Sequence, residues 1–237
     1  MKIEQYHKMA LEQSYHWWFE GRKKIINTFI KKFSIHKNSK ILDIGAGTGS
    51  NINILNKYGK LEILEPNDVA INYLQKKNPT LKITKGKCPE DLNFKDKFDL
   101  ICLFDVLEHI ENDAQTINKL YYLLNAGGRI FITVPSYKFL WTKHDEEMMH
   151  FRRYSKKQLQ KLFINNFSLE YLTHFNTILF PAALIDRLIK KIIYLKSKNK
   201  NSFLNYIFYK IFSIESFLLK FINFPFGLSM LIVVKKK

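Results

Sequence analysis

The chain has 237 residues, of which 46% are hydrophobic, and a formal net charge of +17. This length accommodates one large α/β domain, or a domain with an appendage. The two cysteines, Cys88 and Cys102, have neither the number nor the spacing of a disulfide framework or a zinc site, which fits a reducing compartment. The N-terminus lacks the apolar segment of a signal peptide, so we expect a cytoplasmic protein.

The positive charge is concentrated in the second part of the chain. Residues 138–237 carry 18 basic and 6 acidic side chains, whereas residues 1–137 carry 20 and 15. A basic region of this kind suggests a nucleic acid or an anionic membrane surface as partner. No RNA-binding module or aromatic RNP-type strand is present, which disfavours nucleic acid. A lysine-rich solvated surface is the plain alternative.

Apolar, β-branched runs alternate with helical patterns. Strands are predicted at 40–44, 61–65, 81–86, 98–104, 128–134, within 167–180, and at 227–236. Helices are predicted at 67–77 and 113–124, between strands. This alternation predicts an α/β fold with parallel strands and crossover helices.

The first predicted strand leads directly into DIGAGTGS, residues 43–50. Its glycines, which permit a tight turn and close approach to a ligand, are Gly45, Gly47 and Gly49. A helix that starts near residue 50 would point its N-terminus at that ligand. Glu65 ends the second strand, where an acid accepts hydrogen bonds from ribose hydroxyls. The glycine spacing is neither that of the dinucleotide fingerprint nor that of a P-loop.

These motifs, with LEPN (64–67) and FDVLEHIEND (104–113), resemble the class I S-adenosylmethionine (SAM) methyltransferases, in particular the type 11/23 small-molecule group. The resemblance implies a Rossmann-like seven-stranded sheet, parallel except for an antiparallel last strand. It implies SAM as methyl donor and S-adenosylhomocysteine (SAH) as product. The implied cofactor-binding residues are Arg22, Asp43, Gly45, Ala46, Gly47, Gly49, Glu65, Pro66, Asn67, Cys88, Pro89, Asp105 and Val106.

The resemblance also divides these residues by role. Asp43 and the glycine loop would support the methionine part, and Glu65 would hold the ribose. The adenine would lie between 66–67 and 88–89, although many relatives have an acid where this chain has Lys87 and Cys88. The residues that end the fourth strand, 105 and 106, would face the sulfonium. Glu108 and His109 follow them. His109 could be a base, but we favour a structural role for both residues, in packing or capping.

A cluster of aromatic residues precedes the first strand, within an N-terminal helical cap at 1–39. Trp17, Trp18 and Phe19 are consecutive, so they cannot all face one core from a helix. In relatives with a similar W-W-F-x-x-R signature, this segment folds over the SAM cleft. That would place Arg22 on the SAM carboxylate and Trp18 on the substrate. An aromatic staple that packs the first helix on the sheet is the alternative.

The stretch HDEEMMHFRRYS (144–155) follows the fifth strand, at the ligand edge of the sheet. We expect residues 138–158 to form an acceptor-side lid, ending in a capping box between Ser155 and Gln158. Three of its residues are candidates for the catalytic base and its support: His144, Asp145 and His150. Three others are candidates for binding an anion on the substrate: Arg152, Arg153 and Tyr154.

Two alternatives to this lid remain. A metal site is disfavoured because the spacing matches no metal motif and the arginines would oppose a cation, so no metal is predicted. An internal salt-bridge network, for example of Glu146 or Glu147 with Arg153, would need no substrate. A pattern like W-x-x-H-D…H-x-R-R-Y resembles a methyltransferase subgroup often linked to cell-envelope or lipid-linked sugar pathways.

The body of the cofactor domain is assigned to 40–180, and an amphipathic helical insert at 181–226 separates it from the last strand and basic tail at 227–237. No stretch of the insert is apolar enough to span a membrane. Basic residues at helical spacing favour binding to an anionic membrane surface. In 203–224 we predict a polar stripe through Ser213 and Ser216 and an apolar face through Phe208, Ile211 and Leu218. A further helical layer or a homodimer interface would be the alternatives.

We therefore expect a SAM-dependent methyltransferase that O-methylates a lipid-linked or amphipathic small molecule, peripheral on the inner face of the cell membrane. Two alternatives stay open. One is a soluble quinone-pathway or natural-product methyltransferase. The other is a membrane scaffold that binds SAM without turnover.

Overall fold

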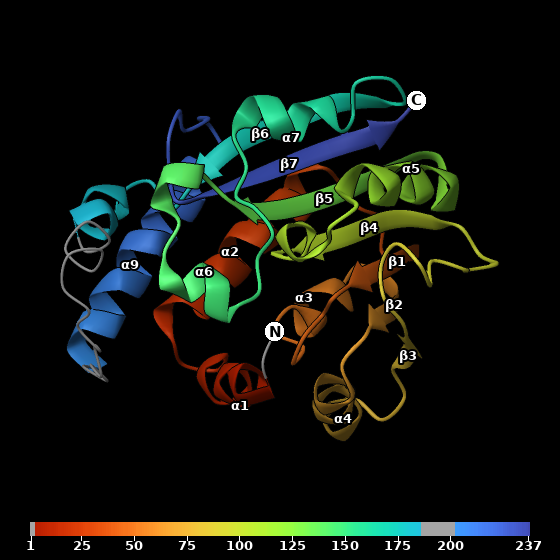
Figure 1. Ribbon diagram of the computed structural model, residues 1–237, viewed down its shortest axis with the longest axis horizontal. Helices are drawn as coiled ribbons and strands as arrows, with labels where there is room; N and C mark the ends of the chain where they lie inside the picture. Colours follow the sequence, from red (N-terminus) through yellow and green to blue (C-terminus); the bar gives the residue numbers. More distant parts are fainter. Residues whose placement is uncertain (1–2, 186–201) are drawn as a thin grey trace.

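The computed structural model describes residues 3–185 and 202–237, which form one α/β domain around a seven-stranded sheet (Figure 1). The strand order is β3-β2-β1-β4-β5-β7-β6. The strands are β1 Ser39–Ile44, β2 Gly59–Glu65, β3 Lys82–Lys85, β4 Phe98–Phe104, β5 Leu124–Pro135, β6 Phe167–Phe175 and β7 Ser229–Lys236. Residues 186–201 of the amphipathic insert expected at 181–226 lie outside the described residues.

The sheet is parallel except at β7. Strands β1 to β5 pair in parallel, whereas β7 is antiparallel to both of its neighbours, β5 and β6. The predicted Rossmann-like fold with an antiparallel last strand is thus confirmed. In such a sheet the carboxyl ends of β1, β2 and β4 meet at one edge, where ligands bind.

Helices cover both faces of the sheet. They are α1 Ile3–Glu12, α2 Trp17–Lys32, α3 Ile52–Leu55, α4 Asp68–Lys77, α5 Asp113–Leu123, α6 Lys143–Glu147, α7 Lys156–Lys161 and α9 Ser202–Leu218, with two 3-10 turns, η1 Leu107–His109 and η2 Lys138–Leu140. Alternate residues of β4 point to opposite faces: Leu100 joins the core under α2 and α9, and Ile101 joins the core under α5 and α7. A strand buried on both faces reads as an apolar run, which is why β4 was predictable.

Helix α9 packs on α2 with the face that the sequence predicted to be polar. Lys24 Nζ donates to Ser213 Oγ at 3.0 Å, and the hydroxyls of Thr28 and Ser216 lie 3.1 Å apart. Phe212, on the same face, is fully buried. The hydrophobic pattern grouped these residues on one stripe but did not identify the side that meets α2, because α9 has apolar residues on most sides.

Two elements end at residues that the hydrophobic pattern did not define. The capping box between Ser155 and Gln158 is confirmed at the start of α7, but this helix ends at Lys161. Strand β6 ends at Phe175, because Asn176 has a φ of 59° and turns the chain out of the sheet. The side chain of Glu215 in α9 then accepts hydrogen bonds from the backbone N–H groups of residues 176–178. This buried carboxylate fixes α9 to the end of β6.

Candidate functional site

The loop between β1 and α3 has the backbone shape that its glycines permit. Gly45, Gly47 and Gly49 have φ angles of 67°, 55° and 85°, in the left-handed region that favours glycine. A Cβ on Gly45 would lie only 2.7 Å from Cγ2 of Val106. Helix α3 starts after Asn51, where the sequence predicted it, and has four residues. The loop therefore packs tightly against the end of β4.

Glu65 ends β2 at the same edge and is buried. Its Oε2 accepts a hydrogen bond from the backbone N–H of Gly47 at 2.9 Å, and its Oε1 accepts one from Asn67 at 3.1 Å. Burial raises the pKa of this carboxyl, although the two backbone hydrogen bonds oppose the shift. Asn67 also caps α4 with its side chain. An acid held beside a glycine loop fits the ribose-binding role that the resemblance implied.

Helix α1 covers this part of the site and contributes a residue that the sequence did not reveal. The phenol of Tyr6 hydrogen-bonds to Glu65, and its pKa is raised by burial and by this carboxylate. The hydroxyl of Thr48 donates to Gln13 Oε1 at 3.1 Å, which joins the end of α1 to the glycine loop. Tyr6 thus occupies an acceptor that ribose hydroxyls would use. A single tyrosine in an amphipathic helix gave no signal for this contact.

Arg22 joins α2 to the ends of β4 and β5. Its Nη1 forms a 2.9 Å ion pair with Asp105 Oδ2, and its Nη2 lies 3.4 Å from Thr133 Oγ1. Its Nε is buried and has no hydrogen-bond partner among the described residues. Burial raises the pKa of nearby Asp43 to about 8, against the opposing charge of Arg22. The ion pair with Asp105 was not predicted, and binding of Arg22 to the SAM carboxylate stays a prediction.

The other residues expected at the cofactor lie around the same edge, and their contacts with SAM stay predictions. Pro66 is exposed before α4, and Ala46 packs on the core below the glycine loop. Cys88 Sγ lies 3.8 Å from Thr116 Oγ1, and burial raises the pKa of this thiol to about 12. Cys88 is therefore a neutral thiol beside Pro89 at neutral pH.

A buried carboxylate fixes the segment between β5 and α7. Asp145 Oδ1 accepts hydrogen bonds from Arg153 Nε at 2.7 Å and His150 Nδ1 at 2.9 Å, and Oδ2 accepts one from the N–H of Thr142 at 2.8 Å. Burial alone would raise the pKa of Asp145, but the bonds from His150 and Arg153 hold it well below its usual range. The expected aspartate–histidine pair thus includes His150. His144 lies exposed on α6.

The three residues expected to hold a substrate anion have internal partners. Arg152 Nη1 pairs with Asp113 at 2.7 Å, and the Tyr154 hydroxyl donates to the same carboxylate at 2.9 Å. Arg153 and Tyr154 are buried, whereas Arg152 is partly exposed. For Arg153 the geometry favours the internal salt-bridge network. The partner of Arg153 is Asp145, whereas the sequence suggested Glu146 or Glu147.

Trp17 and Trp18 pack between α2 and α9. The ring of Trp18 stacks on Phe212, with centroids 5.7 Å apart, and lies near Phe175 at the end of β6. Trp17 meets Phe208 edge-on, with centroids 5.5 Å apart. This arrangement matches the aromatic staple. A contact between Trp18 and the substrate stays a prediction.

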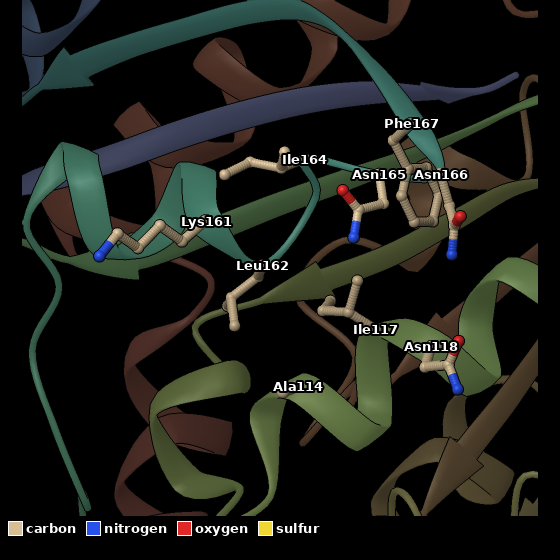
Figure 2. Close-up of a pocket in the computed structure, with 9 residues that line it drawn as sticks. All are labelled: Ala114, Ile117, Asn118, Lys161, Leu162, Ile164, Asn165, Asn166 and Phe167. Carbon is tan, nitrogen blue, oxygen red and sulfur yellow. The ribbon is translucent and has the colours of Figure 1, made fainter.

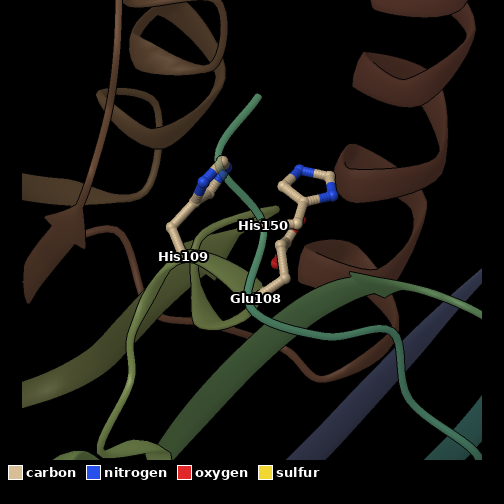
Figure 3. A group of neighbouring side chains, drawn as sticks. All are labelled: Glu108, His109 and His150. Atoms are coloured by element: carbon tan, nitrogen blue, oxygen red, sulfur yellow. The ribbon is translucent and has the colours of Figure 1, made fainter. Parts of the chain in front are cut away.

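Two further features of the structure are a pocket and a cluster of three side chains. The pocket in Figure 2, of about 150 Å³, is lined by α5 and the chain from α7 to Phe167, where β6 begins, and no residue of the glycine loop lines it. In Figure 3, Glu108 and His109 of η1 converge with His150 of the lid. The sequence favoured a structural role for the first two, with His109 as a possible base, and nothing local indicated their contact with residue 150.

Comparisons with known proteins identify the family. A family model described as "Methyltransferase domain" matches residues 18–178. The chain is 27% identical over 138 residues to the mitochondrial ubiquinone biosynthesis O-methyltransferase of Dictyostelium discoideum, a match that covers 50% of this chain and 43% of the relative. It is 30% identical over 166 residues to the ubiquinone biosynthesis O-methyltransferase of Pelagibacter ubique, covering 58% and 68%.

Solved structures share the fold at low sequence identity. The plantazolicin methyltransferase BamL, in complex with a triazolic desmethylPZN analogue and SAH, superposes with a TM-score of 0.61 at 16% identity, covering 91% of this chain and 85% of that one. The match to the first curated relative spans less than half of that protein's length. Because the family model matches more than half of this chain, the chain belongs to the methyltransferase-domain family of SAM-dependent methyltransferases.

Proposed function

We propose that this protein transfers the methyl group of SAM to a hydroxyl oxygen of a lipid-linked or amphipathic small molecule at an anionic membrane surface. The acceptor oxygen attacks the methyl carbon in line, the bond from that carbon to sulfur breaks, and the sulfur keeps the electron pair as SAH forms. The hydroxyl proton passes to a base or to solvent. Such a transfer depends mainly on positioning the two reactants and excluding water.

Oxygen as the acceptor atom is supported by the relatives. Two curated proteins similar to this chain are named O-methyltransferases of ubiquinone biosynthesis. Those names also favour a second candidate function, a quinone-pathway O-methyltransferase. The two candidate functions share the transfer of a methyl group to oxygen. They differ in the acceptor molecule and in whether the enzyme binds it at a membrane surface.

The surface of α9 is the observation that carries the membrane part of the proposal. Outward-facing apolar side chains run along α9 and the turn after it, and Phe217 and Phe221 are 56% and 73% exposed. Other exposed members of this apolar surface are Phe203, Leu204, Tyr206, Ile214, Ile222 and Phe226. An apolar patch on the surface of a folded domain commonly marks an interaction site. No helix among the described residues is long and apolar enough to cross a membrane.

Basic side chains lie directly beside this apolar surface. A groove of about 540 Å³ between α2 and α9 is lined by Lys24, Lys31, Lys32 and Lys220, together with Phe217. Among the residues that line it, none is acidic. Each lysine near an anionic bilayer contributes about 1 kcal/mol to binding. Lysines next to exposed aromatic rings are typical of a face that rests on lipid headgroups.

On the acceptor side, we propose that His150 activates the hydroxyl and that Asp145 fixes its ring. Asp145 holds Nδ1 at 2.9 Å, so the other ring nitrogen is available for chemistry. Of the three residues first expected to bind an anion, the proposal keeps Arg152, because its side chain is 32% exposed. The internal partners of Arg153 and Tyr154 assign them to holding the lid in place.

Vesicle flotation tests the membrane part. The full chain should float with vesicles rich in phosphatidylglycerol and stay at the bottom with phosphatidylcholine alone. The double variants Phe217→Ser/Phe221→Ser and Lys31→Glu/Lys220→Glu should each abolish flotation. Tyr122→Ser, which removes an equally exposed aromatic ring from α5, is the matched control and should float normally.

Equal flotation of all variants would refute the membrane face. If light scattering instead showed a dimer that only the Phe217→Ser/Phe221→Ser variant dissociates, the same face would be an interface between two copies. Point variants are preferred to removing the insert, because Phe212 and Glu215 of α9 belong to the core.

A further inference from the structure

Three side chains with metal-binding atoms meet beside the methyl-donor edge of the sheet. One ligand atom each from Glu108, His109 and His150 lies within 4.8 Å of the others, and the two imidazole centroids are 4.6 Å apart (Figure 3). In a tetrahedral zinc site, ligand atoms lie about 3.3 Å from one another. Rotation of the three side chains can bring their ligand atoms to that separation. Glu108 is buried, while both histidines are partly exposed, so an ion could enter from solvent.

The ring of His150 is oriented as a metal ligand would be. Its Nδ1 bonds to Asp145 at 2.9 Å, which leaves Nε2 as the ring atom that could bind an ion. Asp145 is itself held by Arg153 and Thr142. A carboxylate that fixes the second nitrogen of a histidine is the usual support of a metal-bound imidazole, because it sets the tautomer and raises ligand basicity.

The ring of His109 is held in place by the chain of the lid. The ring hydrogen-bonds to the backbone at Met148 and Met149. Met149 has a φ of 58°, and this left-handed turn brings the chain of the lid back over η1. The backbone N–H of Phe151 then donates to the carbonyl of Glu108 at 2.8 Å.

An unsatisfied buried carboxylate completes the cluster. Glu108 is only 1% exposed, and its Oε2 is buried without a hydrogen-bond partner in the described part of the chain. An unpaired buried acceptor is costly and calls for a specific explanation. A cation would supply the missing partner.

We propose that Glu108, His109 and His150 bind a divalent transition-metal ion of the Zn²⁺ class, with a coordination position open to the acceptor. Two imidazoles and one carboxylate are a ligand set used for zinc and for non-haem iron. The sequence argued against a metal because of the two arginines, but Asp145 and Asp113 neutralise them in the structure.

The position of the ion suggests a role in the proposed O-methylation. This role rests on the proposed function, but the binding of the metal does not depend on it. Glu108 lies three residues after Asp105, the residue expected to face the sulfonium. An acceptor hydroxyl bound to the ion loses its proton to solvent more easily, because the cation stabilises the oxygen anion. His150 then acts through the ion: its Nε2 ligates the metal instead of accepting the proton, and the proton leaves to solvent without a separate base.

Metal titration of the full chain tests the site. Protein freed of metal by a chelator is titrated with Co²⁺, whose visible absorption reports coordination number, and Zn²⁺ competition gives the affinity. One equivalent of Co²⁺ should bind. Glu108→Gln, His109→Gln and His150→Gln should abolish binding, whereas Asp145→Asn should weaken it by about 10-fold to 100-fold. His144→Gln, which removes an exposed histidine of the same lid, should leave metal affinity unchanged.

Measurements of SAM affinity and circular dichroism show which variants are folded, and Glu108→Gln keeps the shape of the side chain it replaces. Absence of stoichiometric binding, or equal affinity in Glu108→Gln and the unsubstituted protein, would overturn the site. The role of the ion has its own readout: Zn²⁺ should raise kcat and move the pH–rate profile to lower pH. Metal binding without transfer to any hydroxyl would refute the proposed function alone, and transfer that ignores Zn²⁺ would refute the role of the ion alone.

Discussion

Replacing Gly21 with alanine tests how closely α9 is held against α2. A Cβ at this position would lie 1.9 Å from Cδ1 and 2.8 Å from Cβ of Phe212. Phe212 is fully buried, so its ring has no free space into which to move. In an exposed helix the change from glycine to alanine stabilises by about 1 kcal/mol, whereas adding a methyl group to a packed core costs about 1–3 kcal/mol. Because a contact of 1.9 Å is far inside van der Waals distance, we expect the overpacking to cost about 2–3 kcal/mol, which leaves a net loss of about 1–2 kcal/mol.

Thermal and urea unfolding measure this loss. A destabilisation of that size lowers Tm by roughly 2–8 °C in a domain of this length. The double variant Gly21→Ala/Phe212→Leu should cost less than the sum of the single variants, because the smaller side chain makes room for the new methyl group. Lys31→Ala, exposed on the same helix, should stay within about 0.5 kcal/mol of the unsubstituted protein. A higher Tm in Gly21→Ala would refute the close packing of the two helices.

Three further predictions concern the cofactor edge. Glu65→Ala should weaken SAM binding by at least about 100-fold in calorimetry, because two hydrogen bonds to a charged group contribute about 1.5–3 kcal/mol each; an unchanged Kd would exclude this ribose site. Tyr6→Phe should tighten SAM binding by about 10-fold, because the phenol no longer competes for Glu65; weaker binding would mean that Tyr6 contacts the cofactor itself. Because burial raises the pKa of Asp43 to about 8, its contribution to stability is fully present below about pH 4 and is lost as pH rises toward 8. The slope from this group reaches about 1.4 kcal/mol per pH unit, and Asp43→Asn should remove it in urea unfolding; a slope equal to that of the unsubstituted protein would refute the assignment.

The sheet was predictable because most of its strands are buried on both faces. The run 98–104 reads as an apolar segment and is β4 over those same residues. Helix α9 shows where periodicity fails: its apolar residues surround most of the helix, and a small residue on α2, Gly21, decided which face docks. The end of β6 depends on the left-handed conformation of Asn176, which hydrophobic pattern does not encode.

The parts of the site that are local in the chain could also be predicted from the sequence. The glycine loop and Glu65 each end a strand, so position along the chain placed them at one edge of the sheet. The contact of His150 with Glu108 depends instead on the path of the lid, which the buried Asp145 and the turn at Met149 determine. Long-range contacts of this kind follow from packing and leave no trace in residue spacing.

Methyl transfer from labelled SAM into fractionated cell extracts tests the central claim most directly. The purified chain, with Zn²⁺ present, is incubated with the lipid, water-soluble, protein and nucleic-acid fractions, and products are identified by mass spectrometry. We expect label in the lipid fraction, on an oxygen atom of an amphipathic molecule, and we expect it to be lost in Glu65→Ala. Label only in the water-soluble, protein or nucleic-acid fractions, or in none while SAM still binds, would contradict the proposed function.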